Sequence, residues 1–180
     1  DYDKEQGHQL SRLLMARDDL TVRRSMADVL TRLFRRLTVD ALPFYNQLKA
    51  DEDPDVLAAV SNTSADLRFL DIDLWAENLL ELSKHELPVV RRNIVPSLRD
   101  YFETFPDDSR KLLPLLWQDG DEVVRTRMRE LLVKMCDISP PKFAARLTDL
   151  SAENCDLDPL WQLMDARRES SSEVWTNWLS

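Results

Sequence analysis

Hydrophobic residues along this chain recur at the spacing of amphipathic helices, and the recurrence itself repeats. Four valines stand 34 residues apart, at Val22, Val56, Val90 and Val124. Four leucines share this interval and stand eight residues before the valines, at Leu14, Leu48, Leu82 and Leu116. A fixed period of this length is typical of stacked units, none of which can bury its apolar face alone.

Each unit is predicted to be a helix A that ends near the leucine, a short turn, and a helix B that begins near the valine. The expected A helices span residues 4–17, 39–51, 72–85, 107–118 and 140–152. The expected B helices span residues 20–37, 54–70, 88–104, 121–137 and 158–169. The predicted units are therefore 1–37, 38–70, 71–105, 106–138 and 139–169, with the start of a further helix at 171–180. This pattern predicts an all-α solenoid of about five antiparallel helix pairs.

The turns inside these pairs carry start signals for the B helices. Asp19, Asp53 and Asp121 stand three residues before the repeated valine, where a carboxylate can accept hydrogen bonds from the free N–H groups of the new helix. Pro54 and Pro88 fall in the first helical turn, where a missing N–H costs nothing. We expect these residues to cap and start the B helices.

The apolar stripe of the B helices predicts both the core and its weakest point. In the first unit the stripe consists of Val22, Met26, Val29, Leu30, Leu33 and Leu37. The third and fourth units supply Val90, Ile94, Leu98, Tyr101, Val124, Met128, Leu132 and Met135. In the second unit the stripe reads Val56, Val60, Ser64 and Leu67, which puts a serine where the other units have a leucine. Ser64 also lies in a run of poor helix formers, so packing is expected to be weakest there. Pro96 falls in the middle of the third B helix and is expected to kink it.

At the turns the pattern resembles the HEAT repeat family, whose unit is an antiparallel helix pair with a recurring Asp and a Val-Arg at the start of the second helix. The matching segments are Asp19-Leu20-Thr21-Val22-Arg23, Asp121-Glu122-Val123-Val124-Arg125, Val90-Arg91 and Asp53-Pro54-Asp55-Val56. Leu57 and Leu87 depart from it, since they replace the expected Arg and Asp. The resemblance implies a right-handed solenoid and a structural ladder between neighbouring units. Its members are Arg23, Arg91 and Arg125 with Asp19, Asp53 and Asp121.

A period of 34 residues is also that of tetratricopeptide repeats. Those repeats place Gly and Ala where their two helices cross closely. The chain holds only two glycines, at Gly7 and Gly120, and lacks that pattern. The HEAT-like interpretation is therefore preferred.

Charge restricts the partners that such an array could bind. The net charge of the 180 residues is −9, which disfavours nucleic acid and anionic membranes as general partners. No apolar run reaches the roughly 20 residues of a membrane span. Cys136 and Cys155 lack metal-type spacing and are expected to be unpaired thiols of an intracellular protein, cytoplasmic or nuclear.

A row of arginines is the candidate binding surface. It is expected opposite the core stripe, on the side that is concave in HEAT-like solenoids, and consists of Arg24, Arg35, Arg92 and Arg99. Such a row could hold an acidic protein segment. The alternative is a solvated face whose charges cancel, because Asp28 and Glu103 lie four residues from arginines of the same helices.

Sequence patterns typical of catalysis are missing. Lys84-His85-Glu86 holds the only His-Glu pair, whereas HEAT-like di-iron hydroxylases need several such pairs. The sequence has no Gly-rich phosphate loop and no nucleophile elbow. We therefore expect no enzymatic activity, no bound metal and no cofactor.

The predicted function is protein–protein interaction or scaffolding, with the partner along the concave face of the B helices. The alternatives are a nucleic-acid-binding solenoid similar to the HEAT-like DNA glycosylases and a HEAT-like chromophore lyase. The first predicted helix begins almost at the first residue of the sequence, and residues 173–179 are predicted to begin another helix. We therefore expect the chain to be part of a longer protein, whose remainder is a second partner.

Overall fold

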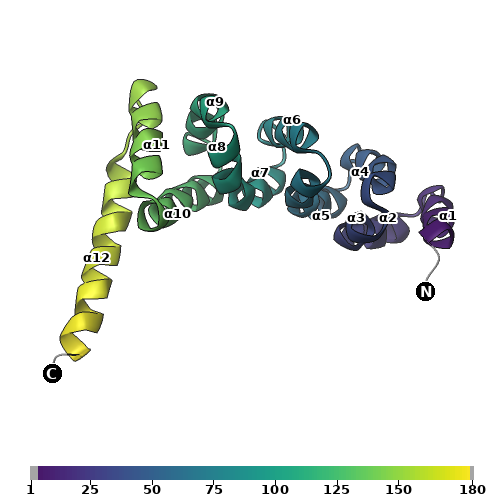
Figure 1. Cartoon of the computed structure of the whole chain (residues 1–180), viewed down its shortest axis with the longest axis horizontal. Coiled ribbons are helices and arrows are strands. Elements are labelled where there is room, and N and C mark those ends of the chain that lie inside the picture. Colours follow the sequence, from purple (N-terminus) through teal and green to yellow (C-terminus); the bar gives the residue numbers. More distant parts are fainter. Residues whose placement is uncertain (1–3, 179–180) are drawn as a thin grey trace. The chain divides into compact units, whose positions relative to one another are not determined.

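The computed structural model is all-α, as the sequence predicts, and contains no strand among residues 4–178 (Figure 1). It describes the backbone of these residues and their side chains, except those of residue 109 and residues 169–178. The chain divides into two compact units at the bond between Ser97 and Leu98. We call them the N-terminal and the C-terminal unit and treat each by itself.

The N-terminal unit contains the first three predicted helix pairs, apart from the end of the third B helix. Its α-helices are α1 (Lys4–Met15), α2 (Leu20–Asp28), α3 (Leu30–Leu37), α4 (Leu42–Lys49), α5 (Pro54–Thr63), α6 (Ile72–Leu82) and α7 (Pro88–Ile94). Its 3₁₀ turns are η1 (Thr38–Ala41), η2 (Ser64–Phe69) and η3 (Val95–Ser97). Helix α2 packs on α5, and α5 packs on α7, so the starts of successive B helices are neighbours.

The C-terminal unit contains α8 (Leu98–Thr104), α9 (Pro106–Trp117), α10 (Glu122–Ile138), α11 (Pro140–Ala152) and α12 (Asp158–Trp178). Helix α10 packs against α9, α11 and α12, and α9 also contacts α8 and α11. Within this unit, α9 and α10 of the fourth pair lie against each other, and both contact helices of the fifth pair.

The predicted core stripe is confirmed in three of the B helices. Its buried members are Val56, Val60, Ser64, Leu67, Val90, Ile94, Leu98, Tyr101, Val124, Met128, Leu132 and Met135. In the first pair the B helix is interrupted at Val29, between α2 and α3. Its buried face continues on α3 through Leu30, Phe34 and Leu37. Val22 and Leu33, also expected in that stripe, are only half-buried.

Two of the long B helices change to 3₁₀ geometry where the sequence predicts weakness. Helix α5 ends at Thr63, because Ser61, Thr63 and Ser64 each donate a side-chain hydrogen bond to the carbonyl three residues earlier. Such bonds compete with the regular helical pattern and favour the tighter turn. At Pro96, where a kink was expected, the backbone changes to the 3₁₀ turn η3, since proline removes a helical donor.

The structure differs from the sequence prediction at the C-terminal end. A separate helix was expected to start near residue 171, but α12 is continuous from Asp158 to Trp178. After Pro159 this segment contains neither Pro nor Gly, so nothing in it forces a helix to end. The side chains of Trp175 and Trp178 lie outside the described part of the chain.

Candidate docking surfaces and the contacts that position them

The carboxylates expected to start the B helices are caps. Asp19 accepts from the N–H groups of Thr21 and Val22, at 2.8 and 3.3 Å. Asp53 and Asp121 cap α5 and α10 in the same way. Each side chain thus satisfies donors that have no partner inside the helix.

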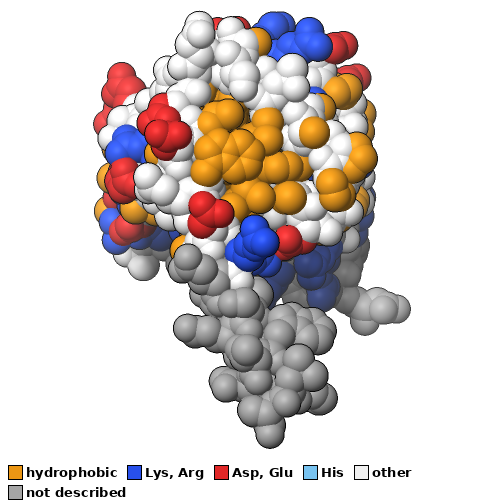
Figure 2. All heavy atoms as spheres, turned by 90° about the vertical axis from the view of Figure 1, so that its left-hand side faces the viewer, with side chains coloured by type: hydrophobic (Ala, Val, Ile, Leu, Met, Phe, Trp, Pro, Cys, Tyr) orange, Lys and Arg blue, Asp and Glu red, His pale blue; other side chains and the backbone are white. Residues whose placement is uncertain are grey.

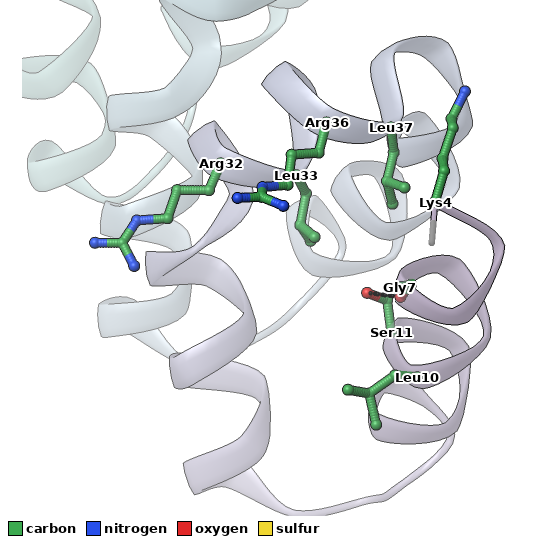
Figure 3. Close-up of a pocket in the computed structure, with 8 residues that line it drawn as sticks. All are labelled: Lys4, Gly7, Leu10, Ser11, Arg32, Leu33, Arg36 and Leu37. Carbon is green, nitrogen blue, oxygen red and sulfur yellow. Dashed lines mark hydrogen bonds between the residues drawn. The ribbon is translucent and has the colours of Figure 1, made fainter. Parts of the chain in front are cut away.

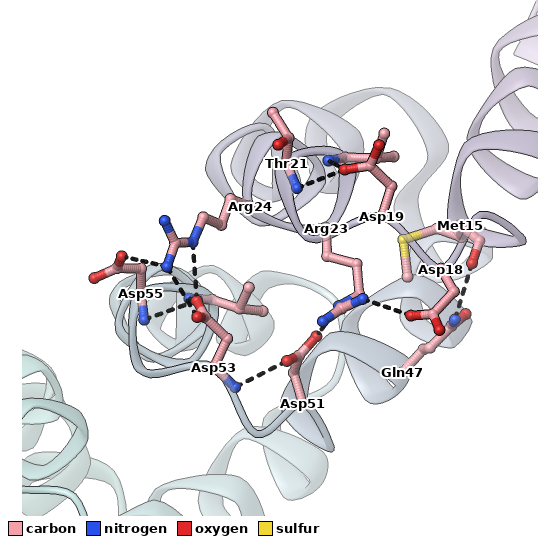
Figure 4. Close-up of polar contacts among 12 residues, drawn as sticks. Met15, Asp18, Asp19, Thr21, Arg23, Arg24, Gln47, Asp51, Asp53 and Asp55 are labelled. Carbon is pink, nitrogen blue, oxygen red and sulfur yellow. Dashed lines mark hydrogen bonds and ion pairs between the residues drawn. The ribbon is translucent and has the colours of Figure 1, made fainter.

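Two arginines of α2 join the first helix pair to the turn of the second (Figure 4). The Arg23 Nε donates to Asp51 Oδ2 at 2.7 Å, and its Nη1 donates to Asp18 at 2.8 Å. The other oxygen of Asp51 accepts from the backbone N–H of Asp53 at 2.9 Å. The side chain of Asp51 is only 8% exposed, whereas that of Asp18 is fully exposed. Asp51 is therefore the enclosed partner of Arg23.

Arg24 belongs to the same network. Its Nε and Nη2 donate to the two oxygens of Asp53, at 3.0 and 2.9 Å, and Nη2 also pairs with Asp55. The hydrogen bond from Arg24 is the main cause that lowers the pKa of Asp53. Arg24, which was predicted to belong to the binding row, is therefore the arginine that contacts the cap of the next B helix, Asp53. Arg23, which was predicted to belong to the ladder, contacts Asp51 instead, two residues before that cap.

A second repeated position, which was not predicted from the sequence, lies two residues before the caps of the second, third and fourth B helices. Asp51, His85 and Asp119 are 34 residues apart. Each accepts a hydrogen bond from the backbone N–H two residues later, at 2.9, 3.1 and 2.8 Å. Asp156 does the same in the last pair, with Asp158. An Asp-x-Asp sequence at the turn could have predicted this contact in the second and fourth pairs. The third pair departs from that sequence, because a ring nitrogen of His85 accepts the hydrogen bond in place of a carboxylate. His85 is thus a turn residue here.

The other two ladder arginines, Arg91 and Arg125, hold the turns that precede their own helices. The Arg91 Nη1 donates to the backbone carbonyls of His85 and Glu86. The Arg125 Nη1 donates to the carbonyl of Asp119, again six residues earlier, and its Nη2 pairs with Glu122. Hydrogen bonds from Arg125 are the main cause that lowers the pKa of Glu122. These arginines tie each helix start to its turn.

The predicted binding row is distributed over both units. Arg24, Arg35 and Arg92 lie in the N-terminal unit, and Arg99 lies in the C-terminal unit, where it pairs with the neighbouring Asp100 at 3.1 Å. Arg92 is half-buried. Arg35 is exposed, on the last turn of α3, and makes no ion pair with any residue that the structure describes.

A groove of about 590 Å³ opens between α1 and α3 in the N-terminal unit (Figure 3). Leu33 and Leu37 point from α3 toward α1, while Leu10 lines the groove from α1. Arg32 and Arg36 border it, and their guanidinium groups extend to the same side of α3 (Figure 3). The sequence reading did not identify this surface.

The C-terminal unit buries an ion pair between Arg146 and Asp149, whose side chains are 10% and 7% exposed. Arg110 of α9 also pairs with Asp149, at 3.2 Å, and Arg146 lies over the ring of Phe102. Burial lowers the pKa of Arg146, and the charge of Asp149 opposes this effect. This cluster joins α9 to α11, and its signal in the sequence was an i, i+3 pair of opposite charges.

The chain holds five tryptophans, and the structure describes the side chains of three of them. Trp75 and Trp117 are buried, so they pack inside their units. Trp161 on α12 is 42% exposed. Hydrophobic side chains gather on this end of the C-terminal unit, over α11 and the start of α12 (Figure 2).

Neither a metal cluster nor a membrane span occurs in the described part of the chain. Among the described residues, no group of three His, Cys, Asp or Glu side chains lies close enough together to hold a metal ion. None of the helices among the described residues combines the length and the apolar composition needed to cross a bilayer. No protein-family model matches the chain, and a search of curated proteins finds no significant relative.

Proposed function

We propose that the chain is a protein-interaction module built from stacked HEAT-like helix pairs. The packing of α2 on α5 and of α5 on α7 supports the stacked arrangement in the N-terminal unit. The hydrogen bonds from Arg23 and Arg24 to the turn of the second helix pair also support stacking. They are contacts between neighbouring pairs of the kind that the family resemblance implies. In the C-terminal unit, the packing of α9 on α11 and of α10 on α12 has the same order.

The observation that carries the binding role is the contrast among the arginines of the N-terminal unit. Arg23, Arg24 and Arg91 make hydrogen bonds within the unit. Arg32 and Arg36 make none with any described residue and border an open apolar groove. Cations without internal partners, next to exposed apolar surface, are typical of surfaces that receive another molecule. A protein fits this combination better than a nucleic acid, since the chain carries a net charge of −9.

A reducing compartment, the cytoplasm or the nucleus, fits this proposal. Cys136 and Cys155 are free thiols, and Cys155 is buried. Burial raises the pKa of the Cys155 thiol, which makes it a poor nucleophile at neutral pH.

Affinity capture from a native lysate, followed by mass spectrometry, tests the proposed function. One half of the lysate is treated with nuclease before capture. The matched control bait is Leu79→Asp, which places an unpaired charge at a fully buried position of α6. We expect the same proteins with and without nuclease, and their loss with the control bait. Enrichment of nucleic acid alone, or of nothing beyond the control, would contradict the proposal.

A further inference from the structure

The wall and floor of the α1/α3 groove are mainly apolar, and the wall is accessible. Leu37 is buried at its base, Leu33 is half-buried, and Leu10 is 46% exposed. Gly7 lines the groove from α1 and adds no side chain to it. Glycine inside a helix costs about 1 kcal/mol relative to alanine, so local helix stability does not explain its presence there. The groove can receive a row of apolar side chains.

The rim of the groove is positive on the α3 side. Arg32 and Arg36 are one helical turn apart and fully available to a ligand, because no described residue bonds to either. On the α1 side, Lys4 pairs with Asp40 at 3.0 Å, and this pairing lowers the pKa of Asp40. The carboxylate of Asp40 is therefore already paired with a lysine.

The apolar wall and the positive rim of the groove together define one kind of ligand. A purely apolar segment would leave Arg32 and Arg36 without partners, and a phosphate backbone would leave the leucines without apolar contacts. We propose that this groove binds an acidic, amphipathic helical segment of a partner protein. Leucine-like side chains of the segment enter between Leu10 and Leu33, and its carboxylates pair with the two arginines. This inference rests on the proposed function and adds the site and the chemistry of the partner.

The test uses the full chain and a synthetic peptide of about 16 residues, which is three to four helical turns. The peptide carries Leu at the i, i+3, i+4 and i+7 positions of one face and Glu elsewhere. Comparison probes are the same composition in scrambled order, polyglutamate of equal length, and a random DNA duplex. Binding is measured by fluorescence anisotropy at two salt concentrations.

Two variants alter the groove in independent ways. The double variant Arg32→Glu with Arg36→Glu reverses the rim charge and is expected to weaken binding at least about tenfold. Gly7→Leu fills the groove without changing charge and is also expected to weaken binding. This substitution improves helix propensity, so loss of binding cannot be attributed to a weaker α1. Should the double variant fail to fold by circular dichroism, Arg32→Gln with Arg36→Gln replaces it.

The matched control is Arg12→Glu with Arg17→Glu, the same charge change on exposed arginines of the same unit that do not line the groove. We expect it to change affinity by less than about threefold. Equal binding of the scrambled peptide, polyglutamate or DNA would overturn the inference, as would equal losses in control and groove variants. If the groove variants retain the proteins captured from lysate, the groove assignment is wrong and the proposed function stands. If wild type captures none, the proposed function fails.

Discussion

The carboxylate of Asp51 provides a sharp test of how consecutive helix pairs are joined. Arg23 has two acidic partners at similar distances, Asp18 at 2.8 Å and Asp51 at 2.7 Å, but only Asp51 is enclosed. Asp51 also accepts from the backbone N–H of Asp53. We expect Asp51→Ala to destabilise the N-terminal unit strongly and Asp18→Ala to have little effect.

The magnitude follows from the contacts that each substitution removes. Asp51→Ala removes one hydrogen bond from a charged donor, worth about 1.5–3 kcal/mol, and one from a backbone N–H, worth about 1 kcal/mol. The expected loss in free energy of unfolding is therefore about 2–4 kcal/mol. Asp18→Ala removes an exposed ion pair, whose usual contribution is below about 1 kcal/mol.

Urea unfolding, followed by far-ultraviolet circular dichroism, measures both losses, and hydrogen exchange of residues 50–63 locates them. A double-mutant cycle with Arg23→Ala then isolates each pair. The coupling energy is expected to be about 1–2 kcal/mol for Arg23 with Asp51 and near zero for Arg23 with Asp18. Equal losses for Asp18→Ala and Asp51→Ala, or a loss below about 0.5 kcal/mol for Asp51→Ala, would refute this reasoning.

Three further outcomes are expected. Because Arg24 lowers the pKa of Asp53, the stability that this carboxylate contributes is present above its ordinary pKa of 3.8 and is lost as the pH falls below it. The urea midpoint of Arg24→Gln should therefore depend less on acid than that of wild type, and identical pH profiles would exclude the effect. We expect the exposed apolar face around Trp161 to associate between copies of the chain in sedimentation velocity. Trp161→Gln should then associate less than wild type while stability changes by less than about 0.5 kcal/mol, and equal association of the two proteins would show that this face is inert. Among the internal B helices, amide exchange should be fastest at residues 58–66, and uniform protection would contradict the assigned weakness of the end of α5.

Periodicity and capping chemistry predict much of the fold. The stripe from Val56 to Leu67 is buried as expected, and Asp53 caps α5. These features are local, since a helical period and a carboxylate before a helix act over a few residues. The weakness at Ser64 was also readable from sequence, because serine side chains compete for backbone acceptors.

The binding surface could not be predicted from such local sequence patterns. Assigning arginines by helical angle places Arg24 on an open face, but whether it is free depends on Asp53, which stands 29 residues later on a neighbouring turn. The α1/α3 groove depends on how far two separate helices approach each other, and helical period alone does not fix that distance. Leu33 illustrates this, since the sequence assigned it to the core, and it lines the groove as a half-buried side chain.

Hydrogen exchange of the full chain, free and bound to the protein captured from lysate, tests the binding role and its location together. If the chain binds a protein segment in the groove, exchange slows in α1 and α3, at residues 4–15 and 30–37, and Arg32→Glu with Arg36→Glu removes the protection. Protection confined to the C-terminal unit, or a complex that leaves exchange in α1 and α3 unchanged, would contradict this assignment.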